Sequence, residues 1–155
     1  MNTTVRITLK LIPDSLQTQP VFLCVDDTMV SKFGTKFENV SKLFDHAAHN
    51  GSNYLNGHCF VSVMLCVPAW NRDKVSYLSV PLGYRMWQKK ESKLELAASM
   101  IRQVMPEFHS KDHVVILCDS WYTKQNLVCI VNEYPNLDLI GNARIDSVMY
   151  DLAPA

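Results

Sequence analysis

Two aspartates in this sequence each follow an apolar run, a pattern that can build a metal-binding site. Asp26 comes directly after the apolar residues 21–25, and Asp119 comes directly after residues 113–118. Two nearby carboxylates repel each other, and each raises the pKa of the other unless a cation offsets the charge. Such hard oxygen ligands suit Mg²⁺ or Mn²⁺, and metal ions held by acids stabilise the attacking and leaving oxygens of a phosphodiester. The pair therefore indicates metal-assisted phosphoryl transfer.

A structural role is the alternative for each aspartate. Asp favours turns and helix N-caps, so an aspartate at the end of a strand is common. Either residue alone is better explained in this way, and Asp27 is interpreted as a helper or a simple turn residue. The balance shifts toward a metal site when both aspartates lie on neighbouring strands, so the elements that carry them are decisive.

Five segments have the apolar, branched and aromatic character of strands. They are residues 21–25, 58–67, 75–82, 113–118 and 137–143. Pro68 is expected to stop the second of them, and residues 28–57 are interpreted as a long, partly irregular insertion. Residues 1–20 are interpreted as a lead-in segment without a defined element.

Two helices are predicted between the later strands. The first is indicated by an apolar stripe at spacings of three and four, formed by Leu94, Ala97, Ala98, Ile101 and Met105. Ser92 and Glu95 match a capping box at its start, and Pro106 ends it. The second helix covers residues 127–134 and is closed by Pro135.

The order β-β-β-α-β-α-β predicts an antiparallel meander followed by two strands that enter by right-handed crossovers. The economical arrangement is an α/β fold of ribonuclease H-like type, a mixed five-stranded sheet of order 3-2-1-4-5 with helices on its faces. Strands one and four are then parallel neighbours, about 4.8 Å apart. Their carboxyl ends meet at one edge of the sheet, where Asp26 and Asp119 are expected to converge.

Composition limits the remaining classes of function. The 155 residues, 48% hydrophobic and 19% charged, are typical of one globular domain, and the 15 basic and 15 acidic residues cancel. Overall charge therefore gives no argument for nucleic-acid or membrane binding. No apolar run approaches the roughly 20 residues of a membrane span, and the N-terminus lacks a secretory signal pattern. The odd number of cysteines, without a C-x-x-C pair, predicts a reducing, cytoplasmic location.

Three segments resemble the catalytic domain of DDE transposases of bacterial insertion sequences. They are VFLCVDDTMVSKFGTKFENV, NYLNGHCFVSVML and VVILCDSWYTKQNL, and the resemblance extends over about residues 20–153. In that family the first acid stands in a DDT or DDS element, matched by Asp26, and the second in a D-S/G-W/G-Y element, matched by Asp119. The resemblance implies a ribonuclease H-like domain over residues 1–155, Mg²⁺ or Mn²⁺ as cofactor, and transposon and target DNA as partners. It also implies nucleoid association on DNA and a homodimer of the full-length protein.

The family's third acid is a glutamate on a helix well beyond the fifth strand, and this sequence departs from that pattern. After Asp119 there is a single glutamate, Glu133, on the preceding predicted helix, where it should not reach the metals. Asp146 and Asp151 follow the fifth strand too soon to match. We therefore expect a fragment that lacks the third ligand and a DNA-binding domain, and that is inactive alone.

Basic residues gather in two stretches beside the elements that carry the aspartates. In the insertion and before the first helix they are Lys32, Lys36, Lys42, Arg85, Lys89, Lys90 and Lys93. Solvated lysines explain most of them, but local positive charge can hold DNA phosphates. Exposed aromatic rings can stack on a splayed base, although core packing is their commoner role; the rings in question are Tyr84, Trp87 and Trp121. The candidates for nucleic-acid binding are Lys32, Lys36, Arg85, Lys89, Lys90 and Trp121.

Other reactive side chains are weaker candidates. A minor zinc alternative would use an H-x-x-H spacing without a zinc-finger repeat, and its members are His46, His49, His58 and Cys59. Cys118 lies in an apolar run that disfavours its thiolate, and Ser120 lacks a G-x-S-x-G elbow. The leading hypothesis is a transposase catalytic core for phosphodiester hydrolysis and strand transfer. The alternative is a decayed or domesticated module that binds DNA or protein without catalysis.

Overall fold

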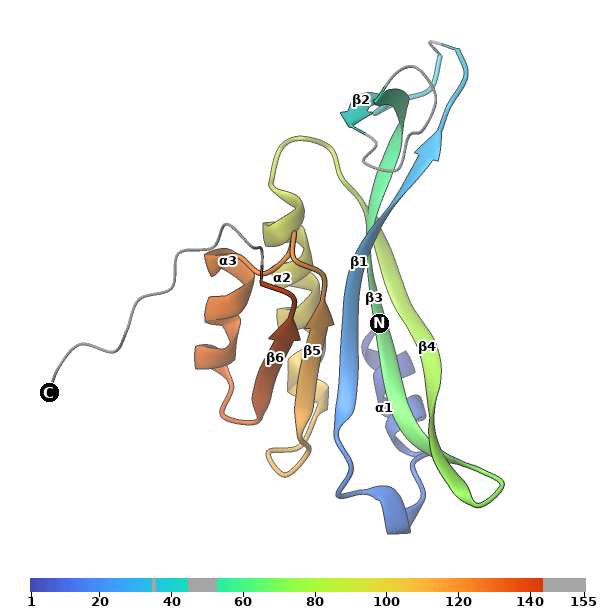
Figure 1. Ribbon diagram of the computed structural model, residues 1–155, viewed down its shortest axis with the longest axis vertical. Coiled ribbons are helices and arrows are strands. Elements are labelled where there is room, and N and C mark those ends of the chain that lie inside the picture. Colours follow the sequence, from blue (N-terminus) through green and yellow to red (C-terminus); the bar gives the residue numbers. More distant parts are fainter. Residues whose placement is uncertain (35, 45–52, 144–155) are drawn as a thin grey trace, which may run out of the picture.

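The computed structural model describes residues 1–34, 36–44 and 53–143 (Figure 1). Within these residues, six strands form one mixed sheet. They are β1 (Val21–Ser31), β2 (Ser41–Phe44), β3 (Tyr54–Asn71), β4 (Lys74–Met86), β5 (Val114–Cys118) and β6 (Leu137–Gly141). The helices are α1 (Asn2–Leu9), α2 (Lys93–Val104) and α3 (Gln125–Val128), with 3-10 turns η1 (Asp14–Leu16), η2 (Met105–Glu107) and η3 (Cys129–Glu133).

The predicted sheet order is confirmed for the five predicted strands, which run β4-β3-β1-β5-β6. β1 pairs antiparallel with β3 and parallel with β5, and β5 pairs parallel with β6. β2 is an additional strand that pairs with the start of β3, on residues that β4 does not reach. The architecture is thus the mixed α/β sheet expected of a ribonuclease H-like fold.

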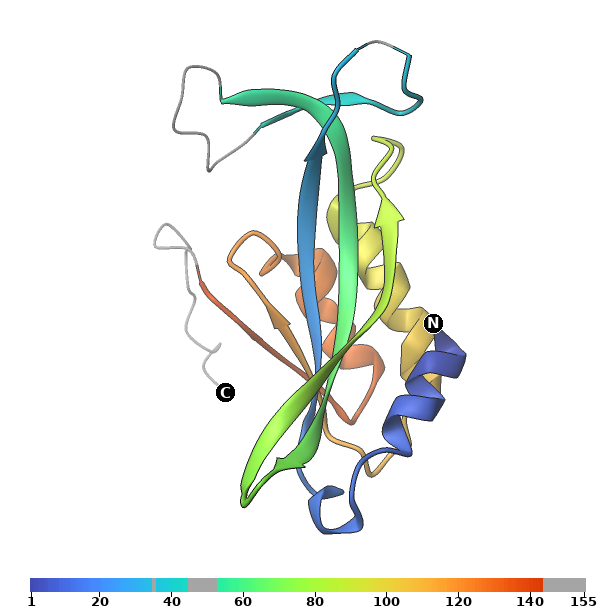
Figure 2. The ribbon, with the colours of Figure 1, turned by 90° about the vertical axis from the view of Figure 1, so that its right-hand side faces the viewer.

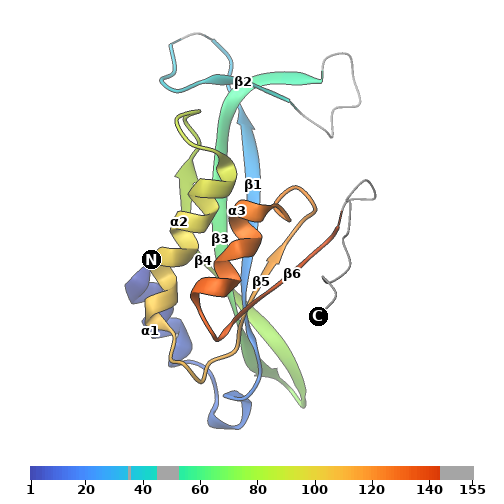
Figure 3. The same ribbon diagram turned by 90° about the vertical axis from the view of Figure 1, so that its left-hand side faces the viewer.

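The described helices lie together on one face of the sheet, on its right-hand side in Figure 2 and on its left-hand side in Figure 3. The burial pattern of β1 identifies the face that the helices cover. Val21, Leu23 and Val25 are buried, whereas the residues between them are not. α2 contributes most to this core, since seven of its twelve residues are buried. None of the helices in the described part of the chain is long and apolar enough to cross a membrane.

β1 is longer than the sequence pattern predicts, and this corrects the expected position of Asp26. The strand continues through Asp26 and Asp27 to Ser31, and its pairing with β3 ends at Ser31 with Gly57. Thr28 and Val30 favour extended structure, and β3 provides a partner strand over this whole stretch. Asp26 is therefore inside β1 and does not end it.

Three other boundaries were also predicted wrongly. Residues 1–20 contain helix α1, and the insertion 28–57 contains the end of β1, all of β2 and the start of β3. β3 also continues through Pro68, which lies beyond the last β1 pair, Phe22 with Cys66. There β3 has a neighbour on one side only, so a proline need not leave a neighbouring carbonyl unpaired.

The start of α2 confirms the capping prediction. The Ser92 hydroxyl accepts a hydrogen bond from the Glu95 backbone N–H at 3.1 Å, while the Glu95 carboxylate accepts from the Ser92 backbone N–H at 2.8 Å. The cap fixes the first helical turn, where Lys93 lies. The second predicted helix is divided into α3 and the 3-10 turn η3.

Candidate active site

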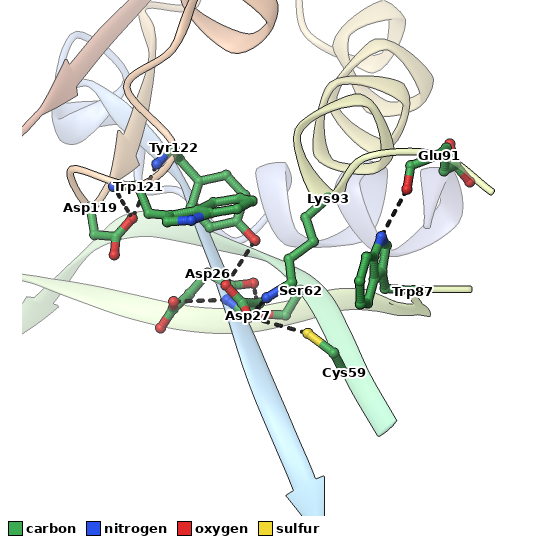
Figure 4. A network of polar contacts seen from close by, with 10 residues as sticks. All are labelled: Asp26, Asp27, Cys59, Ser62, Trp87, Glu91, Lys93, Asp119, Trp121 and Tyr122. Atoms are coloured by element: carbon green, nitrogen blue, oxygen red, sulfur yellow. Dashed lines mark hydrogen bonds and ion pairs between the residues drawn. The ribbon is translucent and has the colours of Figure 1, made fainter. Parts of the chain in front are cut away.

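β1 and β5 bring the two predicted metal ligands to neighbouring positions. The last residues paired between these parallel strands are Val25 and Cys118, and the next residues along the chain are Asp26 and Asp119. Figure 4 shows both carboxylates at this edge, with that of Asp26 turned away from Lys93. Parallel pairing places the residues that follow a matched pair beside each other, so the two aspartates are neighbours although Asp26 lies inside its strand.

Each of these carboxylates uses one oxygen locally. Asp26 Oδ1 accepts a hydrogen bond from the Asp27 backbone N–H at 2.8 Å. Asp119 Oδ1 accepts from the backbone N–H groups of Trp121 and Tyr122, at 3.0 and 3.3 Å. Asp119 thus caps the turn after β5, as the structural alternative requires. Within the described residues, Oδ2 of each aspartate has no hydrogen-bonding partner, and both residues are exposed.

The turn that carries Asp119 is held against the end of β6. The Thr123 hydroxyl lies 2.9 Å from the carbonyl oxygens of both Ser120 and Asn142. Gly141 makes this approach feasible, because a Cβ at that position would collide with the Thr123 side chain. The position of Asp119 therefore depends on β6 as well as on β5.

Asp27 has a different environment from Asp26, because successive residues of a strand point to opposite faces. It shares the covered face with Val25, and its side chain is only 18% exposed. Its Oδ2 lies 2.6 Å from the Lys93 ammonium and accepts the Cys59 thiol at 3.2 Å. Its Oδ1 accepts the Tyr122 hydroxyl at 3.2 Å. Figure 4 shows these partners converging on one carboxylate from β3, α2 and the turn after β5.

Lys93, Cys59 and Tyr122 keep their usual protonation states in this cluster. Burial alone would lower the pKa of Lys93, but the hydrogen bond and charge of Asp27 outweigh it, so the pKa is raised. Burial, and after it the hydrogen bond and charge of Asp27, raise the pKa of the Cys59 thiol to about 11. Burial and the charge of Asp27 also raise the pKa of Tyr122. Lys93 therefore stays protonated, and the thiol and the phenol stay neutral at physiological pH.

Aromatic rings surround the Lys93 side chain. Its ammonium lies 5.2 Å from the Trp121 ring centre and 5.7 Å from that of Trp87, and Lys124 lies 5.1 Å from the Trp121 ring. The Trp87 indole N–H donates to the Glu91 carbonyl at 2.8 Å, which ties down the segment between β4 and α2. Trp121, a predicted DNA contact, is therefore half-buried between two lysines beside the aspartates.

The other predicted DNA contacts lie in different surroundings. Lys89 and Lys90 are exposed just before α2. Arg85 donates to Ser99 at 2.8 Å and to Gln103 at 2.6 Å, so its guanidinium is committed to α2. Lys32 and Lys36 follow the end of β1 at Ser31, beyond Val25, where the pairing of β1 with β5 stops.

The weaker candidates do not assemble a site in the described residues. His58 contacts the Glu38 carbonyl at 2.8 Å, whereas Cys59 donates to Asp27. His46, His49, Asp146 and Asp151 lie outside the described residues. Within residues 1–34, 36–44 and 53–143, no group of three or more His, Cys, Asp or Glu side chains is arranged to hold a metal ion. Glu133 is paired with Arg102 at 2.6 Å on the exposed surface.

Sequence reasoning missed the cluster around Asp27. The signal was present, because extending the alternation of Val21, Leu23 and Val25 by one step places Asp27 on the covered face. It was missed because the strand was expected to end at Asp26. The pairing of Asp27 with Lys93, 66 residues away, has no local sequence signature.

Comparison with known proteins agrees with the fold. No curated protein matches the chain at a significant level. A family model described as DDE superfamily endonuclease matches residues 3–155. Because this match covers nearly the whole sequence, the chain belongs to the DDE superfamily of endonucleases.

Proposed function

We propose that this chain is the catalytic core of a DNA transposase, in which Asp26 and Asp119 hold a divalent metal ion for phosphodiester cleavage and strand transfer. The observation that supports this most strongly is the register of β1 and β5, which sets the two carboxylates at neighbouring positions. The family adds support, because DDE superfamily endonucleases generally depend on divalent metals and act on DNA.

The two carboxylates fit a divalent ion in chemistry, although they supply only part of its ligands. Each has Oδ2 without a partner among the described residues and is exposed to water that can complete the coordination. Hard carboxylate oxygens are the ligands that Mg²⁺ and Mn²⁺ prefer. When bound, such an ion stabilises the charge that develops on the phosphate during displacement. With two protein ligands, the affinity should be weak.

DNA would approach this edge over the segment before α2 and the turn after β5. Lys89, Lys90 and Lys124 are exposed there and can neutralise phosphates. The half-buried Trp121 ring, beside Lys124, is the candidate for stacking on a base. Arg85 would act indirectly in this proposal, because its donors hold α2.

Calorimetric titration with Mn²⁺ tests the proposal on the 155-residue chain. We expect weak binding to the unsubstituted protein and none to Asp26→Asn or Asp119→Asn, with Asp73→Asn as a matched control at the β3–β4 turn. The midpoint temperature of thermal unfolding should be unchanged or higher in the two Asn variants, because each substitution removes one of two repelling charges.

Identical titrations for all four proteins would reject the catalytic assignment. A gel-shift assay with duplex DNA then examines the alternative, a non-catalytic module that binds DNA or protein. Metal-independent DNA binding together with identical titrations would support that alternative.

A further inference from the structure

Tyr122 forms hydrogen bonds both with the turn that carries Asp119 and with strand β1, which carries Asp26 and Asp27. Its backbone N–H donates to Asp119 Oδ1 at 3.3 Å, and its hydroxyl donates to Asp27 Oδ1 at 3.2 Å. The side chain is completely buried, so the ring has little freedom to change its direction. One rigid residue therefore connects the turn that holds Asp119 with the strand that holds Asp26.

Asp27 receives partners on its other oxygen as well. Lys93 at the start of α2 lies 2.6 Å from Oδ2, and Cys59 of β3 donates to the same atom at 3.2 Å. Four segments, β1, β3, α2 and the turn after β5, thus meet at one carboxylate (Figure 4). Because Asp26 and Asp27 share a peptide bond, fixing the Asp27 side chain also fixes the backbone of Asp26.

Asp27 is poorly suited to bind the metal directly. Both of its oxygens accept hydrogen bonds, and one lies against a protonated amine. A second cation at Oδ2 would be repelled by Lys93 or would have to displace it. The acid next in sequence, Asp26, has its free oxygen on the opposite face of β1.

We propose that Asp27, Lys93 and Tyr122 form a positioning network that sets the separation and orientation of the Asp26 and Asp119 carboxylates. The inference rests on the proposed function, since it assigns a task to residues behind that same site. Ligand carboxylates bind metals more tightly when outer partners hold them in place, and losing such a partner commonly weakens binding by about 10–100-fold. Of these three residues, Tyr122 is the one that hydrogen-bonds to both the Asp119 turn and β1, so its hydroxyl is the most direct link to remove.

Mn²⁺ binding to Tyr122→Phe is the test, because this change removes one hydroxyl and keeps the ring. We expect the dissociation constant to rise about tenfold and the electron paramagnetic resonance spectrum of bound Mn²⁺ at saturation to change. Tyr84→Phe is the matched control. Tyr84 is 59% exposed, so this variant should bind Mn²⁺ as the unsubstituted protein does. Ile101→Val removes one buried methyl from α2 and controls for a general loss of stability.

Lys93 provides a second measurement that does not depend on Tyr122. Lys93→Met removes the ion pair and should also alter the bound Mn²⁺ spectrum, whereas Lys93→Arg keeps a cation near Asp27 and should restore it in part. A purely structural role would weaken folding in Lys93→Met without changing the spectrum of the folded, saturated protein. That outcome would overturn the positioning role.

The outcomes separate this inference from the proposed function. If Asp26→Asn and Asp119→Asn abolish Mn²⁺ binding while Tyr122→Phe behaves like Tyr84→Phe, the network has no positioning role and the metal site stands. If Asp27→Asn abolishes binding and Asp26→Asn does not, Asp27 is a ligand and the positioning role is wrong. If the unsubstituted chain binds no Mn²⁺, both proposals fall together.

Discussion

Asp26 and Asp27 are neighbours in the sequence but belong to two different regions of the molecule. Asp26 and Asp119 form an open pair, exposed to solvent, and their carboxylates accept hydrogen bonds from nearby backbone N–H groups. Asp27, Lys93, Tyr122 and Cys59 form a closed cluster on the covered face of β1. The difference arises from the two-residue period of a strand, which places one aspartate in water and the next against α2.

The hydrogen-bonding partners of each carboxylate determine whether it supports the fold or can bind a ligand. In the closed cluster both oxygens of Asp27 are occupied, so the residue contributes to the fold. In the open pair each aspartate keeps one oxygen without a partner among the described residues, so that oxygen can serve a ligand. Substitutions in the two regions should therefore affect folding and binding separately.

The largest expected difference is between alanine substitutions at the two adjacent positions. Asp27→Ala leaves the Lys93 ammonium without its partner in a site where both side chains are 18% exposed. We expect a loss of about 3 kcal/mol in the free energy of unfolding, as for other largely buried ion pairs that lose one member. Asp26→Ala should change it by less than about 0.5 kcal/mol, because the side chain is exposed.

Urea denaturation followed by circular dichroism measures both values under the same conditions. Equal unfolding midpoints for the two variants would contradict the division of roles. A large loss for Asp26→Ala would mean that the open pair supports the fold.

The pH dependence of stability should reveal the raised pKa values of two thiols. Burial and Asp27 raise the pKa of Cys59 to about 11, and burial and Cys66 raise the pKa of Cys24 to about 12. The unfolded chain releases these protons near pH 9, whereas the folded chain keeps them. Stability is therefore fully present below pH 9 and falls as the pH rises from 9 toward 11. Urea midpoints measured from pH 7 to 10.5 should show this decline.

Cysteine variants identify the groups responsible for that decline. Cys24→Ala should flatten the decline above pH 9, and Cys129→Ala should not, because Cys129 is exposed. An unchanged slope in Cys24→Ala would show that other groups control alkaline stability.

A smaller effect is expected at the start of α2, which presents Lys93 to the closed cluster. Ser92→Ala removes the hydroxyl that accepts the Glu95 backbone N–H. We expect a loss of about 1 kcal/mol in the free energy of unfolding, which is typical of an N-cap. Ser110→Ala, at an exposed turn, is the matched control and should have no effect. A result for Ser92→Ala equal to the control would mean that packing alone fixes the first turn.

The sequence predicted the sheet order and the open pair because both depend on local patterns. Apolar runs ending near Asp26 and Asp119, the Ser92–Glu95 capping box and the crossover rule were sufficient to place these residues. The length of β1 was not predictable in the same way, since it is set by pairing with β3 as far as Gly57. Helix α1 was missed because its polar residues mask the buried positions Val5 and Thr8.

The closed cluster depends on contacts between distant segments. Tyr122 and Asp27 are separated by 95 residues, and no local pattern specifies their hydrogen bond. Such contacts follow only after the sheet order and the crossing of α2 are known.

The smallest effect is expected for an ion pair that has the same length as Asp27–Lys93 but lies on the surface. Arg102 and Glu133 approach to 2.6 Å, and their side chains are 47% and 40% exposed. The hydrogen bond from Arg102 lowers the pKa of Glu133. Any contribution of this ion pair to stability is therefore present at neutral pH and is lost as the pH falls through the lowered pKa. Water and salt screen such an exposed pair, so Glu133→Gln should leave the urea midpoint within experimental error at pH 7. The same measurement in 1 M salt should again give no difference, whereas Asp27→Ala should remain strongly destabilised because its partner is sheltered from the solvent. A loss in Glu133→Gln as large as that in Asp27→Ala would mean that burial is not what separates the two ion pairs, and the contrast between open and closed regions would fail.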